Sequence, residues 1–354
     1  MKVKVSECAA LFHHDGKLVW DDYLGHRQYA ITEESERLLR WFSTWRELAT
    51  AGELGERSLE VAERLLDAGV LVAAGSPQHR TEQQVLARWG TWGPAARHFH
   101  FGARALAGTR YLSLEDDAAT MQERARDVPP PAIAKTHPDR PLIPLAAGMP
   151  DASAWPRAQL VDALYGRRST RRFEPEALTL GELGAVLQVA AGILDTLPGD
   201  GTGPAVFKTS PAAGAWHPVE LYVEARRIDG LSPGIYHFAP TRGGLEALDR
   251  GVLGKTAAPA LGGQPWLASA PALIVYTAVI ERAGWRYETS RAYRDVLIGV
   301  GHVSQTVLVT ATAMGLGAVF ATAVCDEDLE LLIGCDPVEE LVLGVAALGH
   351  PAAE

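Results

Sequence analysis

Prolines are unusually dense in the middle of this chain, and they separate two parts with different sequence patterns. They are Pro129, Pro130, Pro131, Pro138, Pro141, Pro144 and Pro150. Proline lacks the backbone N–H group and fixes its own φ angle, so residues 129–150, the proline-rich segment, cannot form a continuous helix or a central strand. With the weakly patterned, aromatic-rich residues ahead of it, this segment predicts a connecting strap over residues 79–152, either a linker or an extended segment lying over another domain.

Residues 1–78 combine strand and helix patterns within a short length. The expected elements are a hairpin over residues 9–20 with its turn at Asp15–Gly16, a helix after Thr32, a helix between Ser58 and Gly69, and a strand at residues 70–72. Asp-Gly is a strong hairpin-turn signal, and threonine is a favoured residue at the N-cap of a helix. This order of elements predicts a small winged-helix-like domain.

Residues 153–354 carry clear helical and strand periodicity. The expected elements are a helix from Pro156 to Leu164, a helix behind a capping box of Thr179 and Glu182, strands at 221–223, 235–238, 273–276 and 341–343, a long helix over 291–314, and a helix from Asp326 to Gly334. These signals combine first-turn prolines, capping residues and one-sided apolar spacing. The mixture predicts an α+β domain of ordinary size.

Charge and cysteine content limit the possible partners. The net charge of -10 argues against nucleic acid, because phosphate backbones are bound by basic surfaces. The three cysteines have no CxxC spacing and no histidine cluster at ligand spacing, so neither a metal site nor a disulfide framework is expected. Residues 1–11 do not resemble a signal peptide, and polar residues interrupt the apolar stretch at 296–324, which favours a buried helix and strand over a membrane span. We therefore expect a cytoplasmic protein.

Arginines are concentrated immediately after a predicted helix end. The run consists of Arg167, Arg168, Ser169, Thr170, Arg171 and Arg172. Guanidinium groups donate paired, charge-assisted hydrogen bonds and hydroxyl groups add further donors, so the run suits a phosphate group. A solvated basic turn is the alternative interpretation.

A second candidate binding segment is rich in small residues. It consists of Ser210, Pro211, Ala212, Ala213, Gly214, Ala215, Trp216, His217 and Pro218. Small residues let a flat ligand approach the backbone closely, where exposed N–H groups can bind it. The alternative is a rigid loop bounded by prolines. His217 is then either a ligand contact or a structural histidine.

A third candidate is the turn Gly315-Leu316-Gly317, which leads from the long helix into a strand pattern. Glycines at this position permit a tight turn against a cofactor. The same residues are also common at an ordinary helix C-terminus, so this turn alone is a weak signal.

The order of these three motifs resembles the nitroreductase superfamily, and within it the SagB/ThcOx-type (McbC-like) dehydrogenases. The resemblance covers residues 153–350. The arginine run is similar to the family's RRSxRxF start, Ser210–Pro218 is similar to its SPSAGALHP segment, and Gly301–Gln305 resembles its GHVxQN helix, with Thr306 in place of the usual asparagine. The resemblance implies a nitroreductase-like fold, with a central mixed or antiparallel sheet flanked by helices, and FMN as the cofactor of a domain over residues 153–354.

The resemblance also implies which residues contact FMN. They are Arg167, Arg168, Ser169, Arg171, Ser210, Pro211, Ala212, Ala213, Gly214, His217, Gln305, Gly315, Leu316 and Gly317. Relatives often place a further basic residue near the C-terminus, but residues 349–354 contain no arginine. Relatives build the flavin site across a homodimer interface, so a homodimer is implied as well.

Many relatives carry a winged-helix-like domain similar to the peptide-recognition elements of ribosomal peptide biosynthesis. In those elements an edge strand and a helix groove hold a leader peptide by strand addition. The alternative for residues 1–78 is a structural appendage that braces the dimer or covers the flavin, because a fold alone does not carry a function.

The subgroup oxidises an azoline ring, thiazoline or oxazoline, to the azole, and a Lys-Tyr pair lies between a strand and the long helix. Here Tyr287 is retained and Arg286 takes the place of the lysine. Arginine keeps its proton and cannot act as a base, so we expect Tyr287 to be the base and Arg286 to stabilise its phenolate by lowering its pKa. Glu288 is a weaker candidate base. The structural alternative is that Tyr287 only packs near the flavin.

The leading hypothesis is an FMN-dependent dehydrogenase that oxidises a peptide-like or carrier-bound azoline in natural-product biosynthesis, with a cyclodehydratase or synthetase as partner. One alternative is another two-electron oxidation of an amino-acid or peptide substrate. A second is a non-catalytic, flavin-stabilised scaffold in a synthetase complex. A conventional NAD(P)H-dependent nitro or quinone reductase fits less well, because of the SagB-like loop and the added domain.

Overall fold

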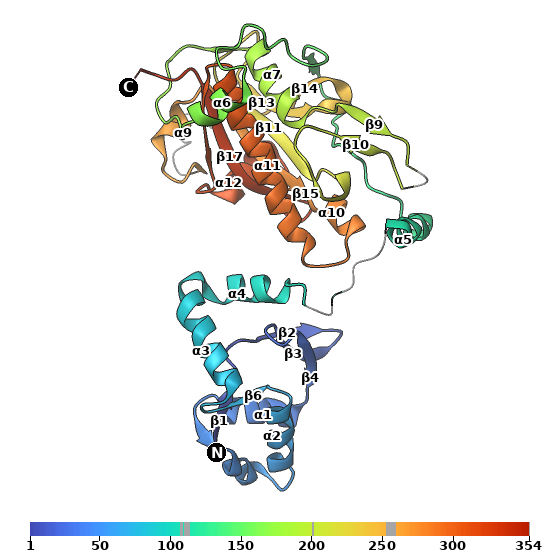
Figure 1. Cartoon of the computed structure of the whole chain (residues 1–354), viewed down its shortest axis with the longest axis vertical. Helices are drawn as coiled ribbons and strands as arrows, with labels where there is room; N and C mark the ends of the chain where they lie inside the picture. The colour runs from blue at the N-terminus through green and yellow to red at the C-terminus, as the bar shows by residue number, and fades with distance from the viewer. Residues whose placement is uncertain (107–108, 110–113, 200–201, 253–259, 354) are drawn as a thin grey trace. The chain divides into compact units, whose positions relative to one another are not determined.

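The computed structural model describes residues 1–106, 109, 114–199, 202–252 and 260–353. The chain forms two compact units, residues 1–110 and 111–354 (Figure 1). This division differs from the boundaries expected at residues 78 and 152. The reason is that the expected strap is not one element, since its first part folds with the first unit and its last part with the second.

The first unit contains two small antiparallel sheets and four α-helices among its described residues. Its elements are β1 (Lys2–Val5), β2 (Ala10–His14), β3 (Lys17–Asp22), β4 (Arg27–Ile31), α1 (Glu33–Trp41), β5 (Arg46–Glu47), η1 (Leu48–Leu54), α2 (Ser58–Asp67), β6 (Leu71–Ala73), α3 (Pro77–Trp89), η2 (Gly90–Trp92) and α4 (Gly93–Gly102). The sheets have the orders β5-β1-β6 and β2-β3-β4.

Local sequence signals explain the elements of the first unit. The β2–β3 turn places Asp15 and Gly16 at φ angles of 48° and 71°, as a two-residue hairpin turn requires. The side chain of Thr32 accepts a hydrogen bond from the Ser35 N–H group and caps α1. The expected hairpin, helices and closing strand are therefore confirmed as elements, and their arrangement is compatible with a winged-helix-like domain.

The second unit is organised around a seven-stranded antiparallel sheet with the order β16-β17-β15-β11-β13-β14-β7. Its strands are β7 (Leu142–Pro144), β11 (Val219–Ala225), β13 (Gly234–Ala239), β14 (Gly244–Ala247), β15 (Ala272–Val279), β16 (Gly317–Ala321) and β17 (Glu340–Gly349). The other elements are α5 (Leu114–Asp127), α6 (Leu160–Gly166), β8 (Leu178–Thr179), α7 (Leu180–Ala191), β9 (Asp195–Leu197), β10 (Ala205–Phe207), η3 (Ala213–Ala215), β12 (Ile228–Asp229), η4 (Pro240–Arg242), α9 (Pro265–Ser269), α10 (Ile280–Arg286), α11 (Ala292–Ala313) and α12 (Asp326–Ile333). The expected α+β class with an antiparallel central sheet is confirmed.

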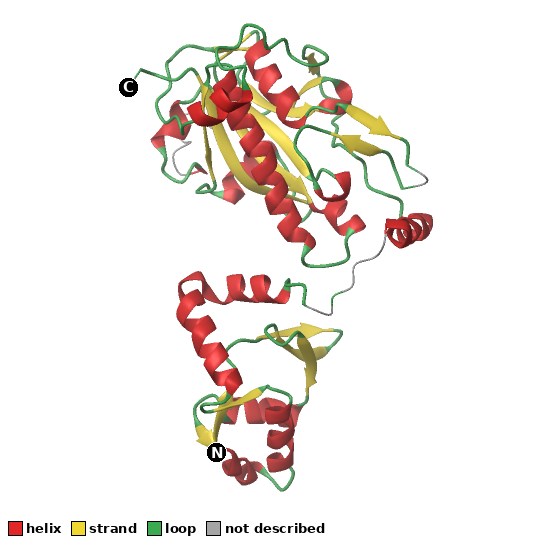
Figure 2. Cartoon of the chain, viewed as in Figure 1, coloured by secondary structure: helices red, strands yellow, loops and turns green. Residues whose placement is uncertain are grey.

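Helices α7 and α11 cover one face of this sheet (Figure 2). Leu183 and Leu187 of α7 and Val303 and Val307 of α11 are buried in the main apolar core with alternate residues of the strands, including Leu221. The capping box of Thr179 and Glu182 at the start of α7 is formed as the sequence predicts. By length and composition α11 could cross a membrane, but much of it is buried within this unit.

One predicted helix starts later than expected. The helix expected from Pro156 begins at Leu160. The reason is that the Arg157 N–H group donates a hydrogen bond of 3.0 Å to the carbonyl oxygen of Ala313, at the end of α11. Residues 156–159 are therefore tied to α11 instead of forming the first helical turn.

The proline-rich segment lies against the other face of the sheet and then enters it. Its last part forms β7, which pairs with β14 at the sheet edge. Ahead of β7, the backbone N–H groups of Lys135 and His137 donate to Glu220 and Glu246, whose carboxylates lie on this face. This segment is therefore an ordered part of the second unit.

Candidate functional site

The arginine run leaves α6 and passes alongside the edge strand β16. Ser169 forms a parallel bridge with Ala318, and the Thr170 N–H group donates to the Ala318 carbonyl oxygen at 3.1 Å. Ser169 and Arg171 are exposed. This backbone pairing brings guanidinium and hydroxyl donors next to the turn that precedes β16.

Arg168 and Arg171 differ in how their guanidinium groups are used. Nη1 of Arg168 donates to the carbonyl oxygens of Tyr165 and Arg167 at 2.9 and 2.8 Å, so this side chain folds back on the local backbone. The guanidinium of Arg171 lies 5.7 Å from the centre of the Trp266 ring. Arg171 therefore presents its charge at the surface beside an aromatic ring.

The Gly315-Leu316-Gly317 turn is explained by close packing. Gly315 has a φ angle of +82°, and the Leu316 N–H group donates to the Ala311 carbonyl oxygen, as at an ordinary helix C-terminus. A Cβ atom on Gly317 would lie 2.6 Å from Cγ2 of Thr170, so the arginine run can approach β16 only because residue 317 is glycine. The Leu316 side chain is buried in the main core.

The small-residue loop is fastened to α11 at its start. The Ser210 hydroxyl is buried, 3.0 Å from the Ala190 carbonyl oxygen and 2.8 Å from Oγ1 of Thr306. Nδ1 of His302 lies 3.0 Å from the carbonyl oxygen of Pro211. Thr306, in the place of the family's asparagine, thus supplies a hydroxyl that contacts Ser210, while Gln305 on the same helix is exposed.

The middle of this loop has a strained backbone. Gly214, Ala215 and His217 have φ angles of +58°, +59° and +32°. A non-glycine residue in this region costs about 1–3 kcal/mol, and such residues are frequent at functional sites. Ala212 and Ala213 precede this stretch. Ala212 is the N-cap of η3 and has an extended backbone, and Ala213 is the first residue of η3.

His217 anchors the end of the loop. Its Nε2 atom is 2.8 Å from the Val206 carbonyl oxygen, and its own carbonyl oxygen accepts a hydrogen bond from Arg282. Burial, with the nearby Lys208 charge, lowers the pKa of His217 to about 4, so the ring is neutral near pH 7. Of the two interpretations of His217, this geometry favours the structural one.

Gly214 brings the loop against Tyr287 and Arg286. A Cβ atom on Gly214 would lie 2.8 Å from Oη of Tyr287 and 3.2 Å from Nε of Arg286. The Arg286 guanidinium lies 4.9 Å from the centre of the Tyr287 ring. The small-residue loop and the Arg286–Tyr287 pair are about seventy positions apart in the sequence. In the folded unit they lie together and form one site.

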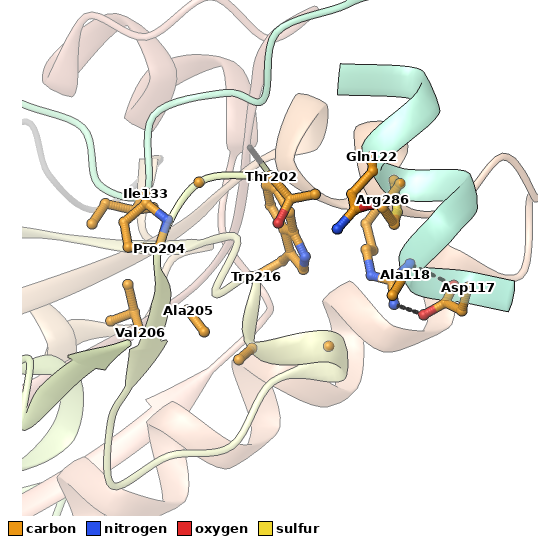
Figure 3. A pocket seen from close by; sticks show the side chains of 14 residues that line it. Asp117, Ala118, Gln122, Ile133, Thr202, Pro204, Ala205, Val206, Trp216 and Arg286 are labelled. Carbon is orange, nitrogen blue, oxygen red and sulfur yellow. Dashed lines mark hydrogen bonds and ion pairs between the residues drawn. The ribbon is translucent and has the colours of Figure 1, made fainter. Parts of the chain in front are cut away.

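Arg286 forms a two-pronged ion pair with Asp117 of α5 (Figure 3). Nη1 of Arg286 is 2.7 Å from Oδ1 of Asp117, and Nη2 contacts the other carboxylate oxygen. The hydrogen bonds from Arg286 lower the pKa of the Asp117 carboxyl and raise the pKa of the guanidinium. Asp117 was not among the residues expected from the sequence, because it lies in the weakly patterned part of the strap.

The electrostatic environment of Tyr287 differs from the expectation. Burial raises the pKa of the Tyr287 phenol, the Arg286 charge opposes this shift, and the Asp117 and Asp295 carboxylates add to it. Arg286 therefore acts in the expected direction, but the net shift of the pKa is upward, because burial, the largest cause, and the two carboxylates outweigh the guanidinium charge. Glu288 points elsewhere and pairs with Arg124 at 2.6 Å.

A cavity of about 300 Å³ adjoins this pair. It is lined by α5, by the residues leading into β10, and by the small-residue loop, with Gly214, Trp216, Asp117 and Arg286 on its wall (Figure 3). The Trp216 ring packs on Trp285, with 4.8 Å between ring centres. The cavity is therefore large enough for one small ring system beside Tyr287 and Arg286.

The predicted site residues form two groups along α11. The arginine run and the glycine turn lie at the C-terminal end of this helix, whereas the small-residue loop contacts it at His302 and Thr306. With a rise of 1.5 Å per residue, Thr306 and Met314 are separated by about 12 Å along the axis. One chain thus presents two separate groups of hydrogen-bond donors along α11, the arginine run and the small-residue loop.

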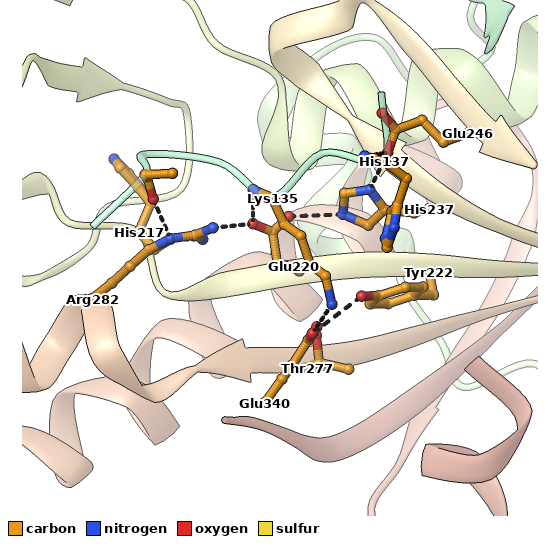
Figure 4. Close-up of polar contacts among 11 residues, drawn as sticks. Lys135, His137, His217, Glu220, Tyr222, His237, Glu246, Thr277, Arg282 and Glu340 are labelled. Carbon is orange, nitrogen blue, oxygen red and sulfur yellow. Dashed lines mark hydrogen bonds and ion pairs between the residues drawn. The ribbon is translucent and has the colours of Figure 1, made fainter. Parts of the chain in front are cut away.

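A buried polar cluster on the other face of the sheet was not predicted (Figure 4). It consists of Lys135, His137, Glu220, Tyr222, His237, Arg242, Glu246, Thr277, Arg282 and Glu340. The His237 ring lies between Glu220 and Glu246, with nitrogen–oxygen distances of 3.2 and 2.9 Å, and Arg282 lies 2.6 Å from Glu220. His137, His237 and Glu246 offer ligand atoms within 4.8 Å of one another, but Lys135, Arg242 and Arg282 already balance the carboxylates.

Comparison with known proteins identifies the second unit. Residues 164–350 match the model of the nitroreductase family. A Methanocaldococcus jannaschii protein described as a candidate nitroreductase is 35% identical over 175 residues, which cover 49% of this chain and 84% of the relative. The trifolitoxin-processing protein TfxB of Rhizobium leguminosarum bv. trifolii is 29% identical over 173 residues, which cover 47% of this chain and 46% of TfxB.

The fold comparison gives the same result. A candidate nitroreductase from Anabaena variabilis has a TM-score of 0.55 and 22% identity, over 73% of this chain and 48% of that protein. The chain therefore spans about half the length of TfxB and of the Anabaena protein.

Proposed function

Because this chain belongs to the nitroreductase family and has FMN as its cofactor, we propose that it is a dehydrogenase that oxidises an azoline ring to the azole. The observation that carries the proposal is the close approach of Gly214 to Tyr287 and Arg286, beside a cavity that Gly214 and Arg286 line. An azoline loses one hydrogen as hydride and one as a proton. FMN, when bound, supplies the two-electron acceptor, and the side chains of this chain must bind the ring and receive the proton.

The donors around the arginine run fit the cofactor's phosphate. Arg167, Arg168, Ser169 and Arg171 bring positive charge and a hydroxyl group to the surface beside the Gly315–Gly317 turn. Such groups form the charge-assisted hydrogen bonds that a phosphate requires. These residues would hold the phosphate end of FMN, and the small-residue loop would lie against its flat ring.

The proposal includes a homodimer with FMN at the interface. Apolar side chains are exposed on α6 and on the N-terminal half of α11. They are Leu160, Val161, Leu164, Tyr165, Leu297 and Ile298. An exposed apolar patch of this kind favours a protein partner, and a second copy of the chain would bring its own loop toward the arginine run. Size-exclusion chromatography with light scattering tests the dimer, and a monomer in the FMN-bound protein would contradict it.

A peptide-like substrate is the preferred substrate class. It is supported by the alignment with a protein named for trifolitoxin processing. In the first unit, β2 is a sheet edge and an apolar hollow of about 400 Å³ is lined by Leu11, Leu18, Trp20 and Leu39. A leader peptide from a cyclodehydratase or synthetase pathway could pair with the edge strand β2 as an added strand and place apolar side chains in the hollow. A purely structural role of this unit has the same geometry.

Tyr287 is the proposed proton acceptor, and Arg286 stabilises its negative charge. The test is oxidation of a model thiazoline by the FMN-loaded protein, followed as loss of flavin absorbance without oxygen and as loss of two hydrogens by mass spectrometry. Tyr287→Phe is expected to lower kcat by about a hundredfold or more, because a positioned acid or base contributes that much. Tyr236→Phe is the matched control, since its hydroxyl donates to the Ser232 carbonyl oxygen and Tyr236 is not among the residues that line the cavity.

The pH dependence gives a second readout. The pKa of Tyr287 lies above its ordinary value of 10.0. If the phenolate is the base, kcat rises about tenfold per pH unit and does not level off below pH 10, because the deprotonated fraction keeps increasing. A Tyr287→Phe variant with unchanged turnover would support the scaffold alternative instead.

A further inference from the structure

We propose that Arg286 binds a carboxylate carried by the substrate, and that Asp117 of α5 occupies this position until the substrate binds. The inference rests on the proposed function, because it concerns which azolines the site accepts. It assigns the substrate to ring acids, in which a free carboxylate is attached to the azoline ring. Azolines whose carboxyl group is tied up as an amide or thioester would lack the recognised group.

The first argument is the shape of the donor. A guanidinium presents two parallel N–H donors that match the two oxygens of a carboxylate, which an ammonium group cannot do. Arg286 uses both of its terminal nitrogens for Asp117 in this way. The guanidinium is also held in place from behind by the Tyr287 ring and by the close approach of Gly214 to Nε. Arg286 is thus a preformed receptor for a planar carboxylate.

The second argument is that Asp117 can be replaced. Exchange of one carboxylate for another on Arg286 keeps the ion pair and its hydrogen bonds, so its net cost is small. Helix α5 has separate attachments near its C-terminal end, because Arg124 pairs with Glu288 and the Trp285 Nε1–H group donates to the Val128 carbonyl oxygen. α5 therefore stays attached to the unit when Asp117 leaves Arg286.

The third argument is the position of the cavity. Asp117 and Arg286 both line it, together with Gly214, Trp216 and Met121 (Figure 3). A ring placed over Gly214 would have a carboxylate within reach of Arg286 and its carbon atoms next to the Tyr287 hydroxyl. The same guanidinium that replaces the family's lysine would then select the substrate and orient it for proton removal.

A purely structural tether predicts the opposite behaviour of Asp117. If the ion pair only fixed α5, removal of the Asp117 charge would loosen the cavity wall and weaken every ligand. If Asp117 competes with the substrate, its removal strengthens the binding of carboxylates alone. Asp117→Asn separates the two, and Asp117→Ser is the second variant in case the first unfolds.

The experiment measures binding of unreactive azoles to the FMN-loaded full chain by calorimetry. The probes are 2-methylthiazole-4-carboxylate and its carboxamide. Wild type is expected to bind the acid about tenfold more tightly than the amide, and Asp117→Asn to increase affinity for the acid by about another tenfold, since a charge-assisted pair contributes this much. Arg286→Gln should abolish the preference, and Arg286→Lys should weaken it. Glu123→Gln, which removes an exposed charge from the same helix, is the matched control.

Equal binding of acid and amide by both wild type and Asp117→Asn would overturn the inference, and so would weaker acid binding by Asp117→Asn. A short peptide ending in the same thiazole acid distinguishes the two possible sources of the carboxylate. If the peptide binds more tightly than the small acid, the natural group is a peptide terminus. If it binds more weakly, the natural group belongs to a free small acid. Both results keep Arg286 as the receptor. The assay involves no turnover, so absence of thiazoline oxidation with intact acid binding would contradict only the proposed function.

Discussion

The two faces of the seven-stranded sheet are both buried and both hold an apolar core, but the second, the polar face, also holds the buried polar cluster. Under α7 and α11, β11 contributes Leu221 and Val223 to an apolar core. On its other face the same strand contributes Glu220, which is 4% exposed and paired with Arg282 and His237. Alternation of apolar and charged residues in a strand therefore marks two different faces, and it does not show that the charged face meets water.

The difference also concerns how each face is held together. The apolar face is covered by helices with one-sided leucines and valines, and any well-packed apolar side chain contributes there. On the polar face, Leu267 of α9 and Leu329 and Ile333 of α12 belong to an apolar core, whereas the polar cluster is covered by the proline-rich segment through ion pairs and backbone N–H groups. Its stability therefore depends on complete pairing, because an unpaired buried charge is very costly.

Loss of one carboxylate on the polar face should have the largest effect. Glu220→Ala leaves Arg282 and His237 without their shared partner and should lower the free energy of unfolding by about 3–5 kcal/mol. Urea unfolding of the full chain measures it. Glu176→Ala, at an exposed position, is the control with an expected change within about 0.5 kcal/mol. An effect of Glu220→Ala as small as this control would show that the polar face is not a paired network.

Truncation on the apolar face should have a somewhat smaller effect. Leu221→Ala, the neighbour of Glu220 on the opposite face, should lower the free energy of unfolding by about 3 kcal/mol through lost burial and a residual cavity. Leu197→Ala serves as comparison, because Leu197 is 53% exposed. If Leu221→Ala costs more than Glu220→Ala under the same conditions, the ranking of the two faces is wrong.

Lowering the pH should distinguish the polar face from the apolar face. The expected change in the free energy of unfolding is smaller than for either truncation. The pKa of Glu220 is lowered from 4.5 to about 2, because hydrogen bonds from His237 and the Arg282 charge outweigh burial. A lowered folded-state pKa means that stability is fully present above pH 4.5 and is lost as the pH falls toward 2. We expect wild type to lose about 2 kcal/mol between pH 5 and pH 3. Glu220→Gln should show a flatter profile in the same urea titrations, whereas Leu221→Ala should keep the wild-type slope.

The elements that the sequence predicted well are those with local signals. The Thr179–Glu182 capping box, the Asp15–Gly16 turn and the glycine stop after α11 each depend on residues a few positions apart, and each is found as expected. The helix expected at Pro156 begins late because its backbone is tied to Ala313, far along the chain. Such a contact leaves no trace in local periodicity.

The candidate site shows the same limit. The three motifs could be found because glycines, prolines and arginines in a fixed order are visible in one sequence. Asp117 could not be found, since its partner Arg286 is 169 positions away and α5 has a weakly amphipathic, highly charged sequence. The net upward shift of the Tyr287 pKa could not be predicted either, because it follows first from burial in the folded unit, to which the Asp117 charge on that helix adds.

The attachment of the proline-rich segment has a consequence for synthesis of the chain. Lys135 pairs with Glu340, a residue 205 positions later in the chain and at the start of the last strand. The segment leaves the ribosome long before this partner exists, so its docking cannot be completed until β17 has emerged. During that interval the Lys135 ammonium group lacks its carboxylate partner, although the backbone N–H groups of Lys135 and His137 are already available to Glu220 and Glu246. A nascent chain of the second unit therefore passes through a stage in which its future interior is still open to water and to chaperones.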